Sequence, residues 1–325
     1  MNMNDRALAP KGSIAVVIPT YDHGPLLRAA VASVLAQTRP AAEIIVVSDG
    51  APIDPADFIG DLLDGGSLRI LRKANGGAPL ARDFGARRAT SDYLIFFDDD
   101  DTLLPDAFDH LGALLDQQPN AVAAAGGTRL ISRPGAPLWL PEPVPDDQYF
   151  RKLLDGNEFL GGATMIRRDA YHRVGGYDPE IRGVEDWYMN LRLAWLGPIA
   201  VHQGVVVEYF EHPGSYSSNF TQLDYAVVLA RKIARIVGPG GRAAGNHIRS
   251  FLFEMYLDKV LTQIRQDFRT GRMRAAARKI RRILKPLFLP WPSRSVLRTW
   301  LRIVREHFRH SRAAKAGSRP EEMQA

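Results

Sequence analysis

The sequence predicts an α/β protein in which a mostly parallel central sheet is flanked by helices and followed by a C-terminal helical extension. Short β-branched apolar runs alternate with segments of helical periodicity up to about residue 125. Hydrophobic residues make up 46% and charged residues 24% of the 325 residues, which is the usage of a globular chain with a sizeable core. From residue 223 onward the pattern is helical and strongly basic.

The predicted elements follow one another in short units. The first strand covers residues 14–18 and ends at Pro19, and the next helix begins at Gly24-Pro25 because proline suits the first turn of a helix. Further strands are expected at residues 44–47, 68–71 and 93–97, and helices at 56–63, 79–89 and 104–115. Beyond residue 125 the pattern predicts strands at 121–125, 129–132, 161–166 and 205–210, a loop at 133–147 and a helix at 186–196.

Four consecutive aspartates, Asp98 to Asp101, directly follow a predicted strand. They lie at the carboxyl end of the sheet, where open α/β sheets bind ligands. Because side chains alternate along an extended segment, we expect Asp98 and Asp100 to point the same way and to share one cation, with Asp99 pointing elsewhere. Oxygen ligands without imidazole or thiolate favour Mg²⁺ or Mn²⁺. The alternative is a solvated acidic turn in which Asp101 caps the following helix.

Composition and missing motifs exclude several classes of protein. The absence of cysteine excludes disulfide scaffolds, thiolate zinc sites, iron–sulfur clusters and a cysteine nucleophile. The turn at residues 19–24 has neither a Gly-x-Gly-x-x-Gly pattern nor a Walker loop, which disfavours a dehydrogenase or a phosphoryl-transfer enzyme. Residues 1–11 lack an apolar signal segment, and no run has the length of a membrane-spanning helix. We therefore expect a cytoplasmic protein, soluble or peripheral on the inner face of the cytoplasmic membrane.

Eight short motifs occur in the order that one enzyme family has them. They are Val17-Ile18-Pro19-Thr20-Tyr21, Ser33-Val34-Leu35-Ala36-Gln37-Thr38, Glu43 to Gly50, Asn75-Gly76-Gly77 with Ala81-Arg82, Tyr93 to Asp101, Gly161-Gly162-Ala163, Gly175-Gly176-Tyr177-Asp178 and Gly183-Val184-Glu185-Asp186. Over roughly residues 12–220 the chain resembles glycosyltransferase family 2, a large inverting family with the GT-A fold. The resemblance implies metal-dependent transfer of a sugar from a nucleotide-diphosphate donor, expected to be a UDP-sugar.

The resemblance implies nucleotide contacts along the carboxyl edge of the sheet. Pro19, Thr20 and Tyr21 would form the floor under the nucleotide, and Asp49 would contact the base. The chain departs mildly from the family's usual Asp-Asp-Gly-Ser, because it reads Ser-Asp-Gly-Ala at residues 48–51. The alternatives are a strand-ending proline with a core tyrosine, and a turn-forming Asp-Gly pair.

The same resemblance implies that three further residues contact the nucleotide-sugar donor or its metal ion. Arg82 matches the family's basic residue near the base and diphosphate, and Asp99 joins the nucleotide-binding set. His212 matches a histidine near the diphosphate or the metal, and we include it among the metal ligands. The alternatives are a surface arginine on a helix and a hydrogen-bonded histidine in a loop.

The resemblance places the general base at Asp186, in a Glu-Asp pair at the start of a predicted helix. A sugar hydroxyl is a poor nucleophile near neutral pH, and a positioned carboxylate that takes its proton contributes about 10²–10⁴-fold in rate. The neighbouring Glu185 is expected to orient the acceptor, a saccharide or a lipid-linked saccharide. The alternative is that both carboxylates only favour the helix dipole.

Charge divides the chain into an expected catalytic domain, residues 1–222, and a helical extension, residues 223–325. The first part carries 19 Lys/Arg and 29 Asp/Glu, whereas the second carries 23 and 7. At 272–310 arginines mix with apolar and aromatic residues, as in helices that lie on an anionic membrane surface. These helices could instead pack on the catalytic domain, and nucleic acid is not expected because no recognition motif accompanies the charge. The alternative to an enzyme is a catalytically silent sugar-nucleotide-binding or scaffold protein of the same fold.

Overall fold

The chain divides into two compact units, Met1–Ser215 and Tyr216–Ala325, in a computed structural model. The described residues are 11–22, 24–131, 138–146, 148–210, 221–239, 241–249, 251, 264, 266–267, 270–274 and 277–279. Among these residues, no helix is both long and apolar enough to cross a membrane.

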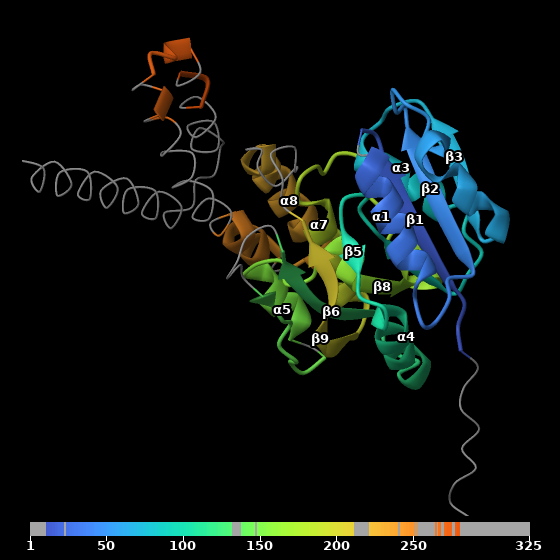
Figure 1. Cartoon of the computed structure of the whole chain (residues 1–325). Coiled ribbons are helices and arrows are strands. Elements are labelled where there is room, and N and C mark those ends of the chain that lie inside the picture. Colours follow the sequence, from blue (N-terminus) through green and yellow to red (C-terminus); the bar gives the residue numbers. More distant parts are fainter. Residues whose placement is uncertain are drawn as a thin grey trace, which may run out of the picture. The chain divides into compact units, whose positions relative to one another are not determined.

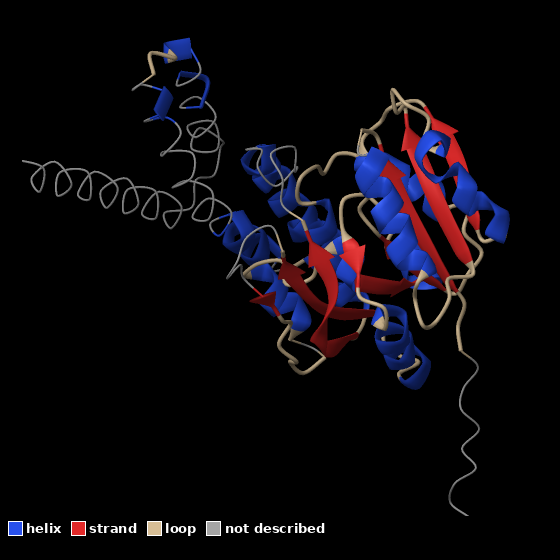
Figure 2. Cartoon of the chain, viewed as in Figure 1, coloured by secondary structure: helices blue, strands red, loops and turns tan. Residues whose placement is uncertain are grey.

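The described part of the first unit is built on a nine-stranded sheet with helices on both faces (Figures 1 and 2). The strand order is β3-β2-β1-β4-β8-β6-β9-β5, and β7 pairs with β6. Strands β3, β2, β1 and β4 are parallel, as are β6 and β9, whereas β8, β5 and β7 run antiparallel to their neighbours. The strands are β1 Ile14–Thr20, β2 Glu43–Asp49, β3 Leu68–Lys73, β4 Tyr93–Phe96, β5 Thr102–Leu103, β6 Ala123–Leu130, β7 Leu138–Trp139, β8 Thr164–Arg167 and β9 Ile199–Tyr209.

Strands β1 and β2 are buried along their whole length, which is why they read as continuous β-branched runs. Val16 belongs to the same hydrophobic core as Leu27 of α1, which covers one face of these strands in Figure 1. On the other face, a Cβ added to Gly85 of α3 would lie 2.5 Å from Val17. The helices of this unit are α1 Gly24–Leu35, α2 Ala56–Ile59, α3 Ala78–Ala86, α4 Ala107–Gln117, α5 Tyr149–Leu154, α6 Arg168–Arg173 and α7 Glu185–Leu196, with 3₁₀ turns at Gly60–Gly65 and Gly161–Ala163.

The structure differs from the predicted elements mainly after residue 100. Residues 121–125 and 129–132, expected as two strands, are spanned in large part by the single strand β6. The helix expected from residue 104 begins at Ala107, because Thr102–Leu103 pairs with β9 and keeps the chain extended there. The strand expected at 161–166 begins at Thr164, after a 3₁₀ turn.

Glu43 connects the amino end of β2 to the loop that precedes β4. Its Oε1 accepts hydrogen bonds from the backbone and side chains of Thr90 and Ser91, and its Oε2 accepts one from Arg69 at 2.7 Å. Burial opposes ionisation, but these hydrogen bonds outweigh it and lower the pKa of Glu43 to about 2. This carboxylate therefore fixes the amino end of β2 to the loop before β4.

The described part of the second unit is helical. Helix α8 covers Thr221–Val237, and residues 241–249 are helical as well. Leu229, Ile233 and Ile248 are buried. Asp267 is buried too and accepts a hydrogen bond from Lys279 at 2.7 Å, so at least one basic residue of this unit is used in packing.

Candidate active site

The aspartate run forms a turn at the carboxyl end of β4. The N–H of Asp101 bonds to the carbonyl of Asp98 at 3.4 Å, so the chain turns here and does not continue extended. Oxygen atoms of Asp98, Asp100 and Asp101 lie within 4.8 Å of one another, and we call these three carboxylates the acid corner. The alternation argument required an extended segment, and the turn adds a third carboxylate that it did not predict. Asp99 is buried.

Asp101 does not cap the following helix. Its Oδ1 accepts a hydrogen bond from the N–H of Phe210 at 3.2 Å, and its side chain is buried. Asp106 occupies the N-cap position of α4. Burial, together with the charges of Asp98 and Asp100, raises the pKa of Asp101 well above its ordinary value. The acid corner thus gathers three partly buried carboxyl groups, and the charges of Asp98 and Asp100 disfavour ionisation of Asp101.

The acid corner fits a hard divalent cation. Three carboxylates supply oxygen ligands alone, which suits Mg²⁺ or Mn²⁺ better than zinc or copper. Their mutual repulsion is the second argument, because a cation among them would relieve the charge that raises the pKa of Asp101. Asp98, Asp100 and Asp101 are therefore the residues that would hold such an ion.

Arg82 of α3 lies between the acid corner and the start of α7. Its guanidinium donates to Oδ1 of Asp98 at 2.5 Å and to Oε1 of Glu185 at 3.4 Å, and it lies 3.7 Å from Oδ1 of Asp186. With 4% of its surface exposed, Arg82 is not the surface arginine of the alternative interpretation. Burial disfavours its charge, but Asp98 and Asp186 outweigh burial and keep its pKa raised. One buried cation therefore joins the two groups of acids that the sequence placed far apart.

Glu185 and Asp186 form the first turn of α7, after Val184 at the N-cap position. The Asp186 carboxylate accepts a hydrogen bond from the phenol of Tyr177 at 2.9 Å and another from the backbone of Gly161. A Cβ at Gly161 would lie 3.0 Å from Oδ2 of Asp186, so this glycine gives the carboxylate its room.

Both carboxylates have raised pKa values. Burial is the main cause for each, and Arg82 opposes it. The charge of Asp186 adds to the rise in the pKa of Glu185, and the charge of Asp98 adds to that of Asp186. A carboxylate whose pKa is raised is a stronger base, which is the property that proton removal from a hydroxyl requires.

Asp49 ends β2 and organises the loop between β3 and α3. Its carboxylate accepts the N–H groups of Gly76 at 3.0 Å and Gly77 at 2.6 Å, and it pairs with Lys73. The side chain of Asn75 donates to the Asp49 carbonyl at 2.9 Å. These contacts give Asp49 a structural role in the loop, and its contact with a nucleotide base stays a prediction.

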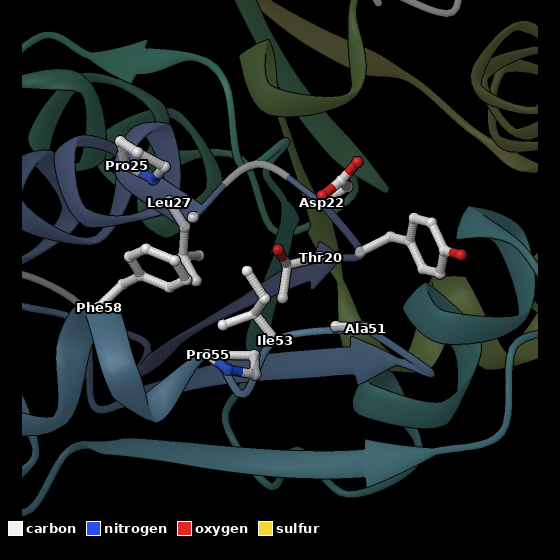
Figure 3. A pocket seen from close by; sticks show the side chains of 10 residues that line it. Thr20, Asp22, Pro25, Leu27, Ala51, Ile53, Pro55 and Phe58 are labelled. Atoms are coloured by element: carbon white, nitrogen blue, oxygen red, sulfur yellow. The ribbon is translucent and has the colours of Figure 1, made fainter.

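A cavity of about 210 Å³ lies beside the ends of β1 and β2 (Figure 3). Thr20 and Asp22 supply its polar side, and Leu27, Ile53 and Phe58 are among its apolar lining residues. Tyr21 also lines it and is 52% exposed, so this tyrosine is not the core residue of the alternative interpretation. Pro19, within β1, is buried and is not among the residues that line the cavity.

The structure thus brings Arg82, Glu185 and Asp186 together with the acid corner and places Asp49, Thr20 and Tyr21 at the same carboxyl edge of the sheet. His212 lies outside the described residues. Sequence reasoning missed Asp101 as a member of the cluster and gave Tyr177 no role. The signal for Tyr177 was present, because it belongs to a motif of the resemblance that had been assigned no chemistry.

Comparison with known families matches residues 15–175 to the model for glycosyl transferase family 2. An uncharacterized glycosyltransferase of Rickettsia felis is 25% identical over 201 residues, 60% of this chain and 33% of the relative. YibD of Escherichia coli K12, also named an uncharacterized glycosyltransferase, is 33% identical over 159 residues, 48% of this chain and 45% of the relative. The glucosyl-dolichyl phosphate glucuronosyltransferase of Haloferax volcanii is 31% identical over 183 residues, 51% of this chain and 56% of the relative. The aligned part of this chain spans 33% and 59% of two curated Rickettsia relatives.

Solved structures show the same fold. S. aureus TarS 1–349 in complex with UDP-GlcNAc has a TM-score of 0.59 at 15% identity, over 76% of this chain and 73% of that one. The mannosyltransferase PcManGT of Pyrobaculum calidifontis, in complex with GDP-Man and Mn²⁺, has a TM-score of 0.53 at 16% identity, over 86% of this chain and 82% of that one. The predicted GT-A fold is therefore confirmed.

Proposed function

This chain belongs to glycosyltransferase family 2, and on that premise we propose that it transfers a sugar, with inversion, from a nucleotide-diphosphate donor to a hydroxyl of a saccharide or lipid-linked acceptor. The observation that carries the proposal is the position of Arg82, which contacts Asp98 of the acid corner and lies 3.7 Å from Asp186. The residues proposed to face the leaving diphosphate and the residue proposed as base are thereby within reach of one reaction centre.

In this proposal Asp186 takes the proton of the acceptor hydroxyl while that oxygen attacks the anomeric carbon from the face opposite the nucleoside diphosphate. The bond from the anomeric carbon to the diphosphate oxygen breaks as the new glycosidic bond forms, so the configuration inverts. Glu185 orients the acceptor, and Arg82 offers its positive charge to the departing diphosphate. Mg²⁺ or Mn²⁺, when held by Asp98, Asp100 and Asp101, supplies Lewis-acid stabilisation of that leaving group.

We propose a UDP-sugar as donor, with its base near Thr20, Tyr21 and Asp49. In support, the cavity beside Thr20 and Tyr21 offers apolar walls with a few polar groups, the usual character of a small-molecule site. TarS, which has the same fold, binds UDP-GlcNAc, whereas PcManGT binds GDP-Man, so the test includes both nucleotides.

We further propose that the acceptor is lipid-linked and that the chain contacts an anionic membrane surface. The Haloferax relative is named for an acceptor that carries a sugar on dolichyl phosphate, which supports a lipid-linked acceptor. The net positive charge of residues 223–325 supports a contact with an anionic membrane surface through 272–310. Co-sedimentation of the full chain with vesicles containing phosphatidylglycerol should fall as salt rises, and no binding at low salt would contradict the membrane contact.

The test of the proposed function is release of nucleoside diphosphate from UDP-GlcNAc, UDP-glucose, UDP-galactose, UDP-glucuronate and GDP-mannose, with and without Mn²⁺. We expect Mn²⁺-dependent release from at least one donor and a loss of 100-fold or more in Asp186→Asn, roughly the worth of a general base. Asp169→Asn is the matched control, because Asp169 is an exposed first-turn carboxylate of α6. Stabilisation by UDP or GDP without turnover would favour the catalytically silent alternative, and neither binding nor turnover would contradict both.

A further inference from the structure

The tyrosine of the Gly-Gly-Tyr-Asp motif, Tyr177, lies directly against the proposed base. Its phenol donates to Oδ1 of Asp186 at 2.9 Å, and the Arg82 guanidinium lies 5.4 Å from the centre of its ring. We propose that Tyr177 is a positioning residue, which holds the Asp186 carboxylate toward the acceptor and away from Arg82. The inference rests on the proposed function and deepens it.

A double-glycine turn delivers Tyr177 to this place. After α6, the N–H groups of Gly175 and Gly176 bond to the carbonyls of His172 at 3.0 Å and Tyr171 at 3.1 Å, and both glycines have positive φ, 86° and 71°. A Cβ at Gly176 would lie 2.4 Å from Oδ1 of Asp83 and 3.1 Å from the Tyr171 hydroxyl, and this crowding adds to the strain that its positive φ imposes on any other residue. The turn therefore directs the next side chain inward.

Packing then fixes the ring of Tyr177. The ring meets Phe96 edge to face, with centroids 4.9 Å apart and planes at 89°. The backbone N–H of Tyr177 donates to the Tyr171 hydroxyl at 3.3 Å, and Tyr177 is 5% exposed. Burial and the charge of Asp186 raise the pKa of Tyr177 well above its ordinary value, so the phenol stays a donor at neutral pH.

The hydrogen bond from Tyr177 competes with the pull of Arg82 on the same oxygen. Arg82 lies 3.7 Å from Oδ1 of Asp186, which is longer than a hydrogen bond, although opposite charges attract each other strongly where water is excluded. The bonds from Tyr177 and Gly161 hold the carboxylate beyond hydrogen-bond distance of the guanidinium, although the two charges still form an ion pair. Because an ionised carboxylate accepts at about four lone-pair positions, capacity remains for the acceptor hydroxyl.

The test is Tyr177→Phe, which removes one oxygen and keeps the ring. Tyr93→Phe is the matched control, because Tyr93 is also buried and its phenol donates to a carboxylate, Asp116 Oδ1, at 2.8 Å, at the opposite end of β4 from the acid corner. Initial rates are measured with the best sugar nucleotide of the five-donor panel, and thermal unfolding is followed for both variants. We expect Tyr177→Phe to lower kcat roughly 10- to 100-fold with the donor KM within about twofold of wild type. Tyr93→Phe should lower only the unfolding midpoint.

Two outcomes separate this inference from its premise. If Tyr177→Phe retains the kcat of wild type while its unfolding midpoint falls as in Tyr93→Phe, the hydroxyl serves folding alone and the inference is overturned, with the proposed function intact. If wild type releases nucleotide from none of the donors, the proposed function fails and the inference fails with it. A 10- to 100-fold rise in the donor KM of Tyr177→Phe with unchanged kcat would also overturn the inference, because the hydroxyl would then act on donor binding.

Discussion

Replacing Glu43 by glutamine should lower the free energy of unfolding at neutral pH, and this loss should become smaller as the pH falls. Glu43 accepts from the N–H groups of Thr90 and Ser91, each at 2.8 Å, from both their hydroxyls, and from Arg69. Glutamine can still accept at its carbonyl oxygen, but its amide then faces the Arg69 donor. The substitution therefore places two donors against each other at the side where Glu43 formed an ion pair.

The pKa shift sets the size of the effect. The contacts lower the pKa of Glu43 from 4.5 to about 2, and at about 1.4 kcal/mol per pKa unit the ionised form contributes roughly 3 kcal/mol to the free energy of unfolding. The Glu43 side chain is 11% exposed, so solvent screens these electrostatic interactions only slightly. Since the pKa is lowered on folding, the contribution is complete above pH 4.5 and is lost as the pH falls toward about 2.

The assay is urea unfolding of wild type and Glu43→Gln at pH 7, 5, 4 and 3, followed by circular dichroism. We expect a difference of about 2–3 kcal/mol at pH 7 that shrinks below pH 4.5. Glu142→Gln is the control, because Glu142 is 83% exposed and its pair with Lys152 should contribute less than about 1 kcal/mol. A wild-type advantage that is the same at pH 7 and pH 3 would refute the argument, since it would show that the charge of Glu43 is not its source.

Three further substitutions test the site. Asp101→Asn removes a buried like charge, so it should raise the unfolding midpoint without metal and reduce the increase in that midpoint caused by Mn²⁺. An undiminished increase with Mn²⁺ would show that Asp101 does not bind the ion. Arg82→Met leaves its acidic partners without their cation and should cost about 3–5 kcal/mol in urea unfolding at pH 7, and less at pH 5; equal losses at both would contradict the charge argument. Gly175 and Gly176 both have positive φ, but only a Cβ at Gly176 would crowd Asp83 and Tyr171, so Gly176→Ala should destabilise by about 1–3 kcal/mol more than Gly175→Ala; similar unfolding midpoints would refute the close approach.

Much of the fold was predictable because its signals are local. The apolar runs of β1, β2 and β4 are buried on both faces, and a strand of that kind reads as apolar whatever its neighbours are. The acidic run at the end of β4 and the Glu-Asp pair at the start of α7 were also visible, because each is defined by residues next to one another. Less was predictable after residue 100, where pairing with β9 extends Thr102–Leu103 and delays the helix expected there.

The candidate site depends on distances that a linear pattern does not contain. Arg82 reaches Glu185 across 103 positions of sequence, and whether that arginine is buried between acids or exposed on a helix was undecidable from its neighbours alone. The same holds for Asp101, which a tight turn places with Asp98 and Asp100, and for Tyr177, whose direction follows from two glycines with positive φ. Local sequence therefore established the strands, the helices and the chemical types at their ends. Strand order, turn geometry and side-chain packing decided which of those groups meet, because contacts between distant residues arise only when the elements that carry them pack together.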